Sequence, residues 1–502
     1  MRNFLKITSI MMLGAAVLFT GCKKDKEEKF SVTLSVNDPA MGTVVGGGEF
    51  AEGTEIAIVA TPTDGYVFQK WSDGITDNPR KLVVTQNVAL TALFAENNGG
   101  QGGQGGGDGE PQSITLSGTI NENTTWKDLG LPVDYIVNGV IYLEGNALVT
   151  VDSGVTIMFT GVDGAISVGE NAGFKIAGTA NKPVVFTGPT NNQNKGAWGY
   201  IDVNSKRADN VWEYATFKNG GSDSGEWGRV ICNYGKLSMK NCTIDGSLSN
   251  GIALIGDGVF TAFEGNTITN CTNYPLFIDH QASYFCLNAN NTFDTSNGKN
   301  MIALQNSDWS IDNSNKSTLV KMAVPYCLLG WLRLEGSQTF TIEAGTNIKL
   351  TADAGISIDE NVTFIAEGTA DSHIVISGTE NEKSLWENIW YGSKKSASVM
   401  KYIDFKNGGK GDDNASILFI ANGSKLTMEN CSFSETEGAG ILIDNADEIS
   451  GVNITGDTYA NSGSNVKVLS DFGKEDENGD WQDLISGGQT FDNFAAVKAA
   501  ME

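Results

Sequence analysis

Histidine, proline and arginine are scarce in this chain of 502 residues. It contains 2 histidines and 9 prolines against 61 glycines. Only four arginines follow the first 21 residues. Few imidazole or guanidinium side chains are therefore available for acid–base chemistry. Long amphipathic helix patterns are also missing, whereas runs rich in Val, Ile, Thr and Asn dominate, so we expect an all-β fold with many tight turns.

Positive charge is in short supply as well. The chain carries 60 acidic and 34 basic residues. Two of the basic residues, Arg2 and Lys6, belong to the first 21 positions, so the remaining chain has 60 acidic against 32 basic residues and a net charge of −28. Such a charge repels nucleic acid and anionic headgroups. It also disfavours strongly anionic glycans unless calcium bridges them, and no nucleic-acid partner is expected.

Cysteine is sparse and unclustered. Six cysteines follow residue 22, and none lies in a CxxC pair or a Cys/His cluster with zinc spacing. No phosphate loop, HExxH motif or dinucleotide fingerprint occurs either. The sequence therefore indicates no cofactor other than calcium.

The N-terminus has the plan of an export signal. Arg2 and Lys6 precede a mostly apolar run that is short for a membrane-spanning helix. Leu18-Phe-Thr-Gly-Cys22 resembles a bacterial lipobox, which implies that residues 1–21 are a signal peptide and that Cys22 is lipidated. An ordinary signal peptide or an N-terminal membrane helix is the alternative. The charged tether 22–29 resembles the surface-export signals of Bacteroidetes-type lipoproteins, or is a plain spacer. The expected location is the cell envelope, on the outer membrane and surface-exposed, with the lipid as the membrane contact.

Residues 30–96 are predicted to form a small β domain. Alternating strands are followed by Gly65-Tyr-Val-Phe68 and Trp71, an order that resembles the divergent internalin B-repeat family. The resemblance implies a cell-surface spacer or adhesion module. Trp71 is expected in the core, with a sugar-stacking platform as the alternative. Residues 97–112, in which eight of sixteen are glycine, form a flexible linker.

The chain beyond the linker is internally duplicated. Tyr214 to Gly221 reads YATFKNGG and Tyr402 to Gly409 reads YIDFKNGG, and matching segments throughout the two halves (about 113–315 and 316–470) are offset by 188 to 191 residues. Short strands with alternating apolar residues and frequent turn signals favour a solenoid over a β-sandwich.

This repeat looks like the right-handed parallel β-helix (pectin-lyase-like) family over residues 113–470. The resemblance rests on the strand GAWGYI, the segment YATFKNGG and the strand KLSMKNCTI. The expected fold is all-β: a right-handed parallel β-helix solenoid with internal duplication, preceded by the B-repeat-like domain. Residues 471–502 are expected to form an acidic loop and a C-terminal cap with a short helix.

The FKNGG stretch itself predicts a corner. Its Phe can point into the core, its Asn tolerates a left-handed backbone, and its glycines take positive φ without cost. Trp198 and Trp386 also occupy equivalent positions, which suggests that they pack at one structural corner. Cys242 and Cys431 are also equivalent, and about eight rungs at ~4.8 Å separate them, so we expect both to be buried and unpaired.

No catalytic residue is predicted. Pectate lyases need calcium-binding carboxylates and a basic residue, usually arginine, and no arginine here lies in a strand flanked by regularly spaced acids. Asp412-Asp413 resembles the paired acids of polygalacturonases, but the Gly-His-Gly and Arg-Ile-Lys motifs are missing. His280 and His373 are isolated.

Two groups of residues are candidates for binding. Asp476, Asn478 and Asp480 have the spacing of calcium ligands but lack the glycine and glutamate of a calcium loop. The loops that follow the two FKNGG corners differ from each other in sequence, and their residues are candidate ligand contacts. Tryptophans without a counterpart in the other half are candidates as well. Solvated loops and buried core tryptophans are the alternatives. These candidates are Asp223, Glu226, Trp227, Trp390, Asp412 and Asp413.

The sequence therefore indicates a lipid-anchored surface protein. Its favoured role is non-catalytic binding of glycans or surface proteins through the β-helix. A carbohydrate-active β-helix enzyme, either lyase or hydrolase, and a purely structural envelope stalk are the alternatives.

Overall fold

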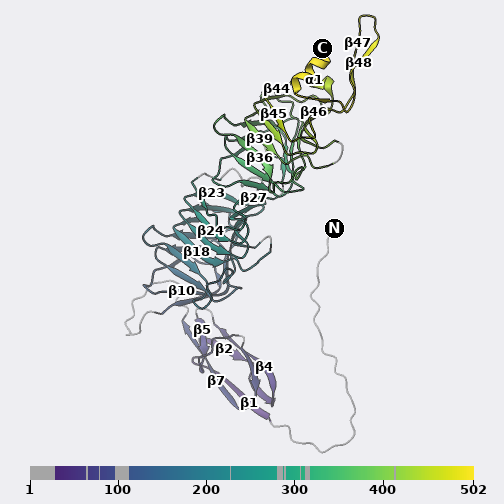
Figure 1. Ribbon diagram of the computed structural model, residues 1–502. Coiled ribbons are helices and arrows are strands. Elements are labelled where there is room, and N and C mark those ends of the chain that lie inside the picture. The colour runs from purple at the N-terminus through teal and green to yellow at the C-terminus, as the bar shows by residue number, and fades with distance from the viewer. Residues whose placement is uncertain are drawn as a thin grey trace, which may run out of the picture. The chain divides into compact units, whose positions relative to one another are not determined.

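The computed structural model describes residues 29–502, apart from positions 64–65, 79, 97–111, 226–227, 280–286, 288–289, 306, 311–316 and 412–413. The predicted sites Cys22, Glu226, Trp227, Asp412 and Asp413 lie outside the described residues. The chain divides into two compact units, residues 1–105 and 106–502. Both units are built from strands, and about 3% of the protein is helical (Figure 1).

The small N-terminal unit has a four-stranded sheet of order β3-β1-β7-β5 and a three-stranded sheet of order β2-β4-β6. Trp71 is fully buried between them, and its indole nitrogen donates to the Asp77 carbonyl at 3.0 Å. Phe68 packs edge-on against Trp71, with 5.4 Å between ring centroids. The core position expected for Trp71 is confirmed. The strands are β1 (Lys29–Val36), β2 (Gly42–Val45), β3 (Gly48–Ala51), β4 (Thr54–Pro62), β5 (Tyr66–Trp71), β6 (Arg80–Val84) and β7 (Val88–Glu96).

The second unit is a parallel β-solenoid of about 13 turns. The solenoid of parallel strands predicted from the sequence is therefore confirmed. Most of the described turns contribute one strand to each of three sheets, and these strands pair in parallel with their counterparts in neighbouring turns. We name the sheets of the first turns A, B and C. Sheet A contains β12 (Thr156–Phe159), β15 (Val184–Thr187), β18 (Ala215–Gly220), β21 (Thr243–Ser247), β24 (Thr267–Cys271) and β26 (Thr292–Phe293). Sheet C contains β9 (Thr124–Trp126), β11 (Leu148–Asp152), β14 (Gly173–Ala177), β17 (Val211–Glu213), β20 (Lys236–Lys240) and β23 (Val259–Glu264).

Sheet B is the sheet that continues through the whole solenoid. It starts with β8 (Ile114–Ile120) and the long β10 (Tyr135–Leu143), which also pairs with β12 of sheet A. Its other strands are β13 (Ala165–Val168), β16 (Ile201–Val203), β19 (Arg229–Asn233), β22 (Asn250–Leu254), β25 (Leu276–Ile278), β27 (Ile302–Leu304), β30 (Tyr326–Leu328), β33 (Asn347–Leu350), β36 (Ile374–Gly378), β39 (Ile403–Lys406), β42 (Ser432–Ser434) and β45 (Thr458–Ala460).

Two further sheets, D and E, flank sheet B in the later turns. Sheet D contains β28 (Ser307–Ser310), β31 (Leu332–Glu335), β34 (Ile356–Ile358), β37 (Ile389–Tyr391), β40 (Ser416–Ile420), β43 (Ala439–Ile443), β46 (Ser464–Val468) and the antiparallel β49 (Thr490–Phe491). Sheet E contains β29 (Ser317–Leu319), β32 (Thr339–Ile342), β35 (Thr363–Glu367), β38 (Val399–Lys401), β41 (Leu426–Glu429) and β44 (Val452–Thr455).

Strands at equivalent positions of the two halves lie in different sheets, displaced by one sheet around the solenoid. Ile157 in β12 and Ile348 in β33 are equivalent positions of the repeat, but β12 lies in sheet A and β33 in sheet B. The change occurs where β27, β30 and β33 pair in succession. Equivalent corners of the two halves therefore join different pairs of sheets.

The interior is filled by inward-facing side chains that stack from turn to turn. The rings of Phe186 and Phe217 stack at 4.8 Å, and those of Phe405 and Phe433 at 4.9 Å. Such ladders form because parallel in-register strands place identical positions one strand spacing apart. Cys242 and Cys431 belong to this core, each 1% exposed, and both thiols are free. The burial predicted for the two equivalent cysteines is confirmed.

Both FKNGG stretches form the predicted corner. Asn219 and Asn407 have φ of 57° and 65°, and the glycines that end the motifs, Gly221 and Gly409, have φ of 69° and 81°. Phe217 and Phe405 are fully buried. The motif is therefore an architectural element.

The C-terminal segment closes the last turn. Residues 471–502, expected to begin with an acidic loop, contain an antiparallel hairpin of β47 (Phe472–Glu475) and β48 (Trp481–Ile485). Helix α1 (Phe494–Met501) is capped by Asn493, whose side chain accepts from the Ala496 N–H at 2.9 Å. Phe494 and Val497 are buried against the end of the solenoid core. A short 3₁₀ helix, η2 (Ala446–Glu448), precedes β44. Within the described part of the chain, no helix is long and apolar enough to cross a membrane.

Candidate functional site

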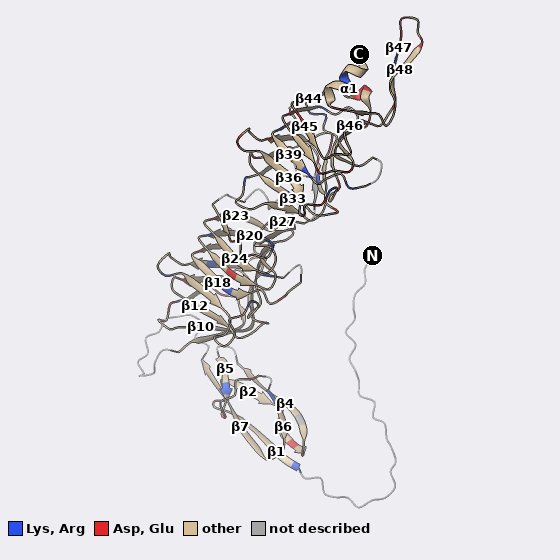
Figure 2. Ribbon diagram, in the orientation of Figure 1, with Lys and Arg blue, Asp and Glu red and all other residues tan. Residues whose placement is uncertain are grey.

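The outer surface of sheet B carries one in-register row of outward-facing side chains. Its members lie between residues whose side chains point into the core, so each faces away from the interior. Figure 2 shows that most strand positions of the solenoid are uncharged, whereas this row includes an acid and two lysines. The row runs through Tyr142, Ser167, Asp202, Cys232, Ala253, Phe277, Ala303, Cys327, Lys349, Ser377 and Lys406.

The middle of this row is apolar and buried although it lies outside the core. Cys232, Ala253, Phe277, Ala303 and Cys327 are at most 2% exposed, and they form a second hydrophobic cluster. Tyr274 belongs to the same cluster and is 7% exposed. These side chains are already covered by other parts of the same chain, so they form a second packed cluster outside the solenoid interior.

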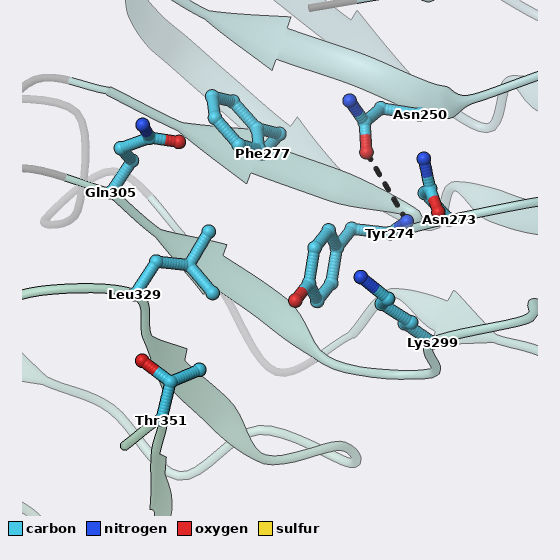
Figure 3. A pocket seen from close by; sticks show the side chains of 8 residues that line it. All are labelled: Asn250, Asn273, Tyr274, Phe277, Lys299, Gln305, Leu329 and Thr351. Carbon is cyan, nitrogen blue, oxygen red and sulfur yellow. Dashed lines mark hydrogen bonds between the residues drawn. The ribbon is translucent and has the colours of Figure 1, made fainter. Parts of the chain in front are cut away.

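A cavity of about 340 Å³ opens beside this cluster (Figure 3). The aromatic rings of Tyr274 and Phe277 and the side chain of Leu329 supply its apolar part. Side-chain amides, a hydroxyl and an ammonium surround these rings. The described lining residues are Asn250, Asn273, Tyr274, Phe277, Lys299, Gln305, Leu329 and Thr351.

Tyr274 is held in place from several sides. The Asn250 side-chain oxygen accepts from the Tyr274 N–H at 3.2 Å, the contact drawn in Figure 3. The ammonium of Lys299 lies 4.9 Å from the centre of the Tyr274 ring. Asn273 is fixed as well, because its amide nitrogen donates to the Ser249 hydroxyl at 2.9 Å. A ring and amides that are already oriented lose little freedom when a ligand binds.

A second tyrosine–cation pair lies on the same sheet, three strands away from the pair of Tyr274 and Lys299. The guanidinium of Arg229 lies 5.5 Å from the Tyr200 ring centre, and it also contacts the Tyr234 hydroxyl at 3.3 Å. Tyr200 and Tyr142 are exposed, at 36% and 45%. Three strand spacings correspond to about 14 Å between the two tyrosine–cation pairs.

Asp202 completes this second cluster. Its carboxylate lies 3.5 Å from the Arg229 guanidinium, and both side chains are less than one-fifth exposed. Burial raises the pKa of Asp202, and the charge of Arg229 opposes that shift. Burial likewise raises the pKa of the neighbouring Cys232 thiol to about 11, so this thiol is protonated at neutral pH. Sequence reasoning missed the pair because the two residues are 27 positions apart and meet only through strand pairing between turns.

The predicted contacts Asp223 and Trp390 lie apart from each other. Asp223 follows β18, at the corner that leads from sheet A to sheet B, and its carboxylate accepts from the Gly225 N–H at 2.8 Å. Trp390 faces outward on β37 of sheet D, half-buried, beside Phe419 of the next strand. The structure therefore does not bring these two residues together.

The predicted calcium ligands lie in the turn of the β47–β48 hairpin. One carboxylate oxygen of Asp476 accepts from the N–H groups of Asp480 and Asn478, at 3.0 and 2.8 Å. These backbone hydrogen bonds lower the pKa of Asp476. The Asp476 carboxylate thus stabilises the backbone of the turn. Across the described residues, no group of three or more His, Cys, Asp or Glu side chains could hold a metal ion.

His373 has a partner that the sequence did not reveal. Its Nδ1 lies 3.2 Å from Asp404, and the Ser432 hydroxyl donates to the same carboxylate oxygen at 2.7 Å. The carboxylate lies between the other two groups, so the serine is not activated by the histidine as in a hydrolytic triad. The arrangement is an outward-facing polar cluster on sheet B.

Comparisons with known families match two segments of the chain. Residues 32–98 match the family described as divergent InlB B-repeat domain. Residues 118–270 match the family described as pectate-lyase like beta helix domain. No curated protein and no solved structure matches the chain significantly.

Proposed function

We propose that this protein binds a glycan chain on the outer surface of sheet B and does not cleave it. The observation that carries the proposal is the cavity beside Tyr274 and Phe277. Aromatic rings pack against the apolar faces of sugars, and fixed amides bind hydroxyl groups as both donors and acceptors. Asn250, Asn273 and Gln305 offer such amides around the two rings.

The lining of the cavity supports binding rather than hydrolysis. Glycoside hydrolysis needs two carboxyl groups on opposite sides of the scissile bond. None of the eight described residues that line the cavity is an acid or a histidine. The cavity therefore has the chemistry of recognition.

The second tyrosine–cation pair extends the proposed surface. Tyr200 with Arg229 and Tyr274 with Lys299 lie on one sheet, about 14 Å apart along the stacking direction. A linear chain of several sugars could contact both pairs at once. We therefore propose a chain-like glycan that lies along the solenoid.

The cellular setting of this proposal rests on the N-terminal sequence. We propose lipidation at Cys22, anchoring in the outer membrane and exposure at the cell surface. Mass spectrometry of the mature protein tests the anchor: a diacylated or triacylated Cys22 is expected, and a chain cleaved elsewhere without lipid would contradict it.

Binding is tested with the soluble chain 23–502 on a glycan array, followed by titration of each positive glycan. We expect Lys299→Ala combined with Gln305→Ala to weaken binding at least tenfold. Trp481→Ala is the control, because Trp481 is 63% exposed and lies on the C-terminal hairpin. Equal losses in both variants, or no binding by the unmodified chain, would contradict the proposal.

A polysaccharide-cleaving enzyme is the second candidate, favoured by the buried contact between Asp202 and Arg229. A carboxylate and a guanidinium side by side could share the proton transfers of a lyase. Incubation with polysaccharides tests it. If the unmodified chain releases unsaturated or reducing sugar, and the Asp202→Asn and Arg229→Ala variants do not, the function is catalysis and not binding alone.

A further inference from the structure

The last turn of the solenoid contains an aspartate where the repeat has an asparagine. Asp457 and Asn266 are equivalent, and each follows a glycine of similar backbone, Gly456 with φ of 73° and Gly265 with φ of 68°. A Cβ on either glycine would lie 2.4 Å from the side-chain oxygen of the preceding corner asparagine. The two sites thus share one backbone geometry.

The asparagine uses both ends of its amide. The Asn266 oxygen accepts from the Cys242 N–H at 2.9 Å, and its nitrogen donates to the Met239 carbonyl at 2.9 Å. It also donates to the Asn291 side chain at 3.0 Å. Every polar atom of this buried amide is therefore satisfied, as buried polar groups require.

The aspartate reproduces only the accepting half of this arrangement. Asp457 Oδ1 accepts from the Cys431 N–H at 3.0 Å, the counterpart of the Cys242 contact. Asp457 Oδ2, the chemical counterpart of the asparagine's donating nitrogen, is buried without a hydrogen-bond partner among the described residues. The counterpart of the Met239 carbonyl is the carbonyl of Met428. A carboxylate cannot donate to that carbonyl, whereas a protonated carboxyl can.

The cap covers this position. A cavity of about 320 Å³ is bounded by the β44–β45 turn, including Asp457 and Tyr459, and by the first turn of α1 with Asn493 and Phe494. The Tyr459 hydroxyl is also buried without a hydrogen-bond partner in the described structure. Burying an unpaired charge at such a contact is costly.

We propose that the C-terminal cap is a proton-dependent latch. Protonated Asp457 donates from Oδ2 to the Met428 carbonyl and holds β44, β45 and α1 on the last turn. Loss of the proton leaves a buried carboxylate without a donor, so these elements separate from the turn below. Separation uncovers the apolar core end that Phe494 and Val497 close.

The surrounding groups agree with this direction. Burial raises the pKa of Asp457 from its ordinary 3.8 to about 7. The charge of Asp457 raises the pKa of the Cys431 thiol and of the Tyr459 hydroxyl, in addition to the larger effect of burial. The charge of Asp404 also raises the pKa of Cys431, and Glu429 is ion-paired with Lys401 at 3.6 Å. On α1, the ammonium of Lys498 lies 5.3 Å from the Phe494 ring centre.

The sign follows from the two protonation states. In an opened cap the carboxyl is solvated and ionises near 3.8, whereas in the closed cap it keeps its proton up to about pH 7. The closed cap is therefore favoured at low pH, and the closed-to-open ratio falls as pH rises from 3.8 to about 7. Since one pKa unit corresponds to a tenfold change, the closed-to-open ratio should fall about 30-fold between pH 5.5 and pH 8.0.

Hydrogen exchange of the full chain, read by mass spectrometry and corrected for intrinsic rates, measures this ratio. Protection of β44, β45 and α1 should fall at least tenfold between pH 5.5 and pH 8.0. Asp457→Asn should keep the high protection at both pH values, while β12 to β18 serve as the internal reference. Protection that is independent of pH in the unmodified chain, or equally dependent in Asp457→Asn, would overturn the proposal.

The reciprocal variant keeps the test decisive if Asp457→Asn does not fold. Asn266→Asp introduces the same carboxyl into a middle turn, so β23 and β24 should lose protection at pH 8.0 and regain it at pH 5.5. An Asn266→Asp chain whose exchange does not depend on pH would contradict the latch. Tyr459→Phe separates the two buried groups, because it should leave the pH dependence in place.

Discussion

The indole ring of Trp198 lies directly on Gly220. A Cβ added to Gly220 would be 2.6 Å from Cζ2 of Trp198. The indole nitrogen donates to the Lys218 carbonyl at 2.7 Å, which fixes the ring across the corner. Trp386 repeats both contacts in the second half, with 2.4 Å to a Cβ on Gly408 and 2.8 Å to the Lys406 carbonyl. The repeated FKNGG sequence therefore encodes a packing contact.

Gly220→Ala should destabilise the solenoid by about 2–4 kcal/mol. The added methyl group must displace a fully buried tryptophan in a close-packed core. Urea unfolding followed by tryptophan fluorescence measures the change in the free energy of unfolding. Gly161→Ala is the control, because nothing lies within 4 Å of a Cβ there. A loss in Gly220→Ala no larger than in the control would show that the ring adjusts freely.

Local signals explain how much of this fold could be predicted. The corner depends on residues that are neighbours in the chain, so Asn219 and Gly221 are enough to predict its left-handed backbone conformation. The turn of one half relative to the other depends on β27, β30 and β33 pairing across successive turns. Pairing between strands 20 or more residues apart leaves no local signal, so the sequence revealed the duplication but not this rotation.

Trp71→Ala should unfold the N-terminal domain without affecting the solenoid. Trp71 is fully buried in a core with few other large side chains, and small domains have little stability to lose. Removal of a buried tryptophan costs about 3–5 kcal/mol. Limited proteolysis should then cleave within residues 29–96 while residues 113–502 stay intact. Val45→Ala, at a position that is 59% exposed, should leave the domain resistant.

Cys242 and Cys431 should resist alkylation in the native protein. Both are 1% exposed, and burial raises the pKa of Cys242 to about 12, so the reactive thiolate is scarce. Iodoacetamide at pH 8 followed by peptide mapping should label them only after denaturation. A disulfide between these two residues would contradict the stacking of the two halves in one solenoid.

Asp476→Ala should loosen the C-terminal hairpin equally with calcium or with a chelator present. The Asp476 carboxylate accepts two backbone N–H groups of its own turn, and these hydrogen bonds do not need a metal ion. Hydrogen exchange of β47 and β48 measures the effect. A calcium-dependent gain in protection that Asp476→Ala abolishes would instead establish the metal site expected from Asp476, Asn478 and Asp480.

The candidate site was harder to predict than the fold, for a physical reason. The cavity draws residues from five successive turns, between Asn250 and Thr351, and it crosses the boundary between the two halves. Asp223 stands out in the sequence as an acid in a loop beyond a repeated corner, and Trp390 stands out as a tryptophan without a counterpart in the other half. A row of outward positions can be found only once the strand register is known, because each member is a single residue in an otherwise ordinary strand.

Asp404→Asn should destabilise the protein at pH 6 and have a smaller effect at pH 3. Burial alone would raise the pKa of Asp404, but hydrogen bonds from Ser432 and His373 outweigh it and lower the pKa. A carboxyl with a lowered pKa adds stability above its ordinary value of 3.8, and that stability is lost as pH falls through the folded-state pKa. Because the side chain is partly exposed, the expected loss at pH 6 is only about 0.5–1 kcal/mol. Urea midpoints of the two proteins at pH 6 and pH 3 measure the difference, and Ser432→Ala should reproduce part of it. A destabilisation that stays constant between the two pH values would show that the charge of Asp404 contributes nothing, and that only its packing on sheet B matters.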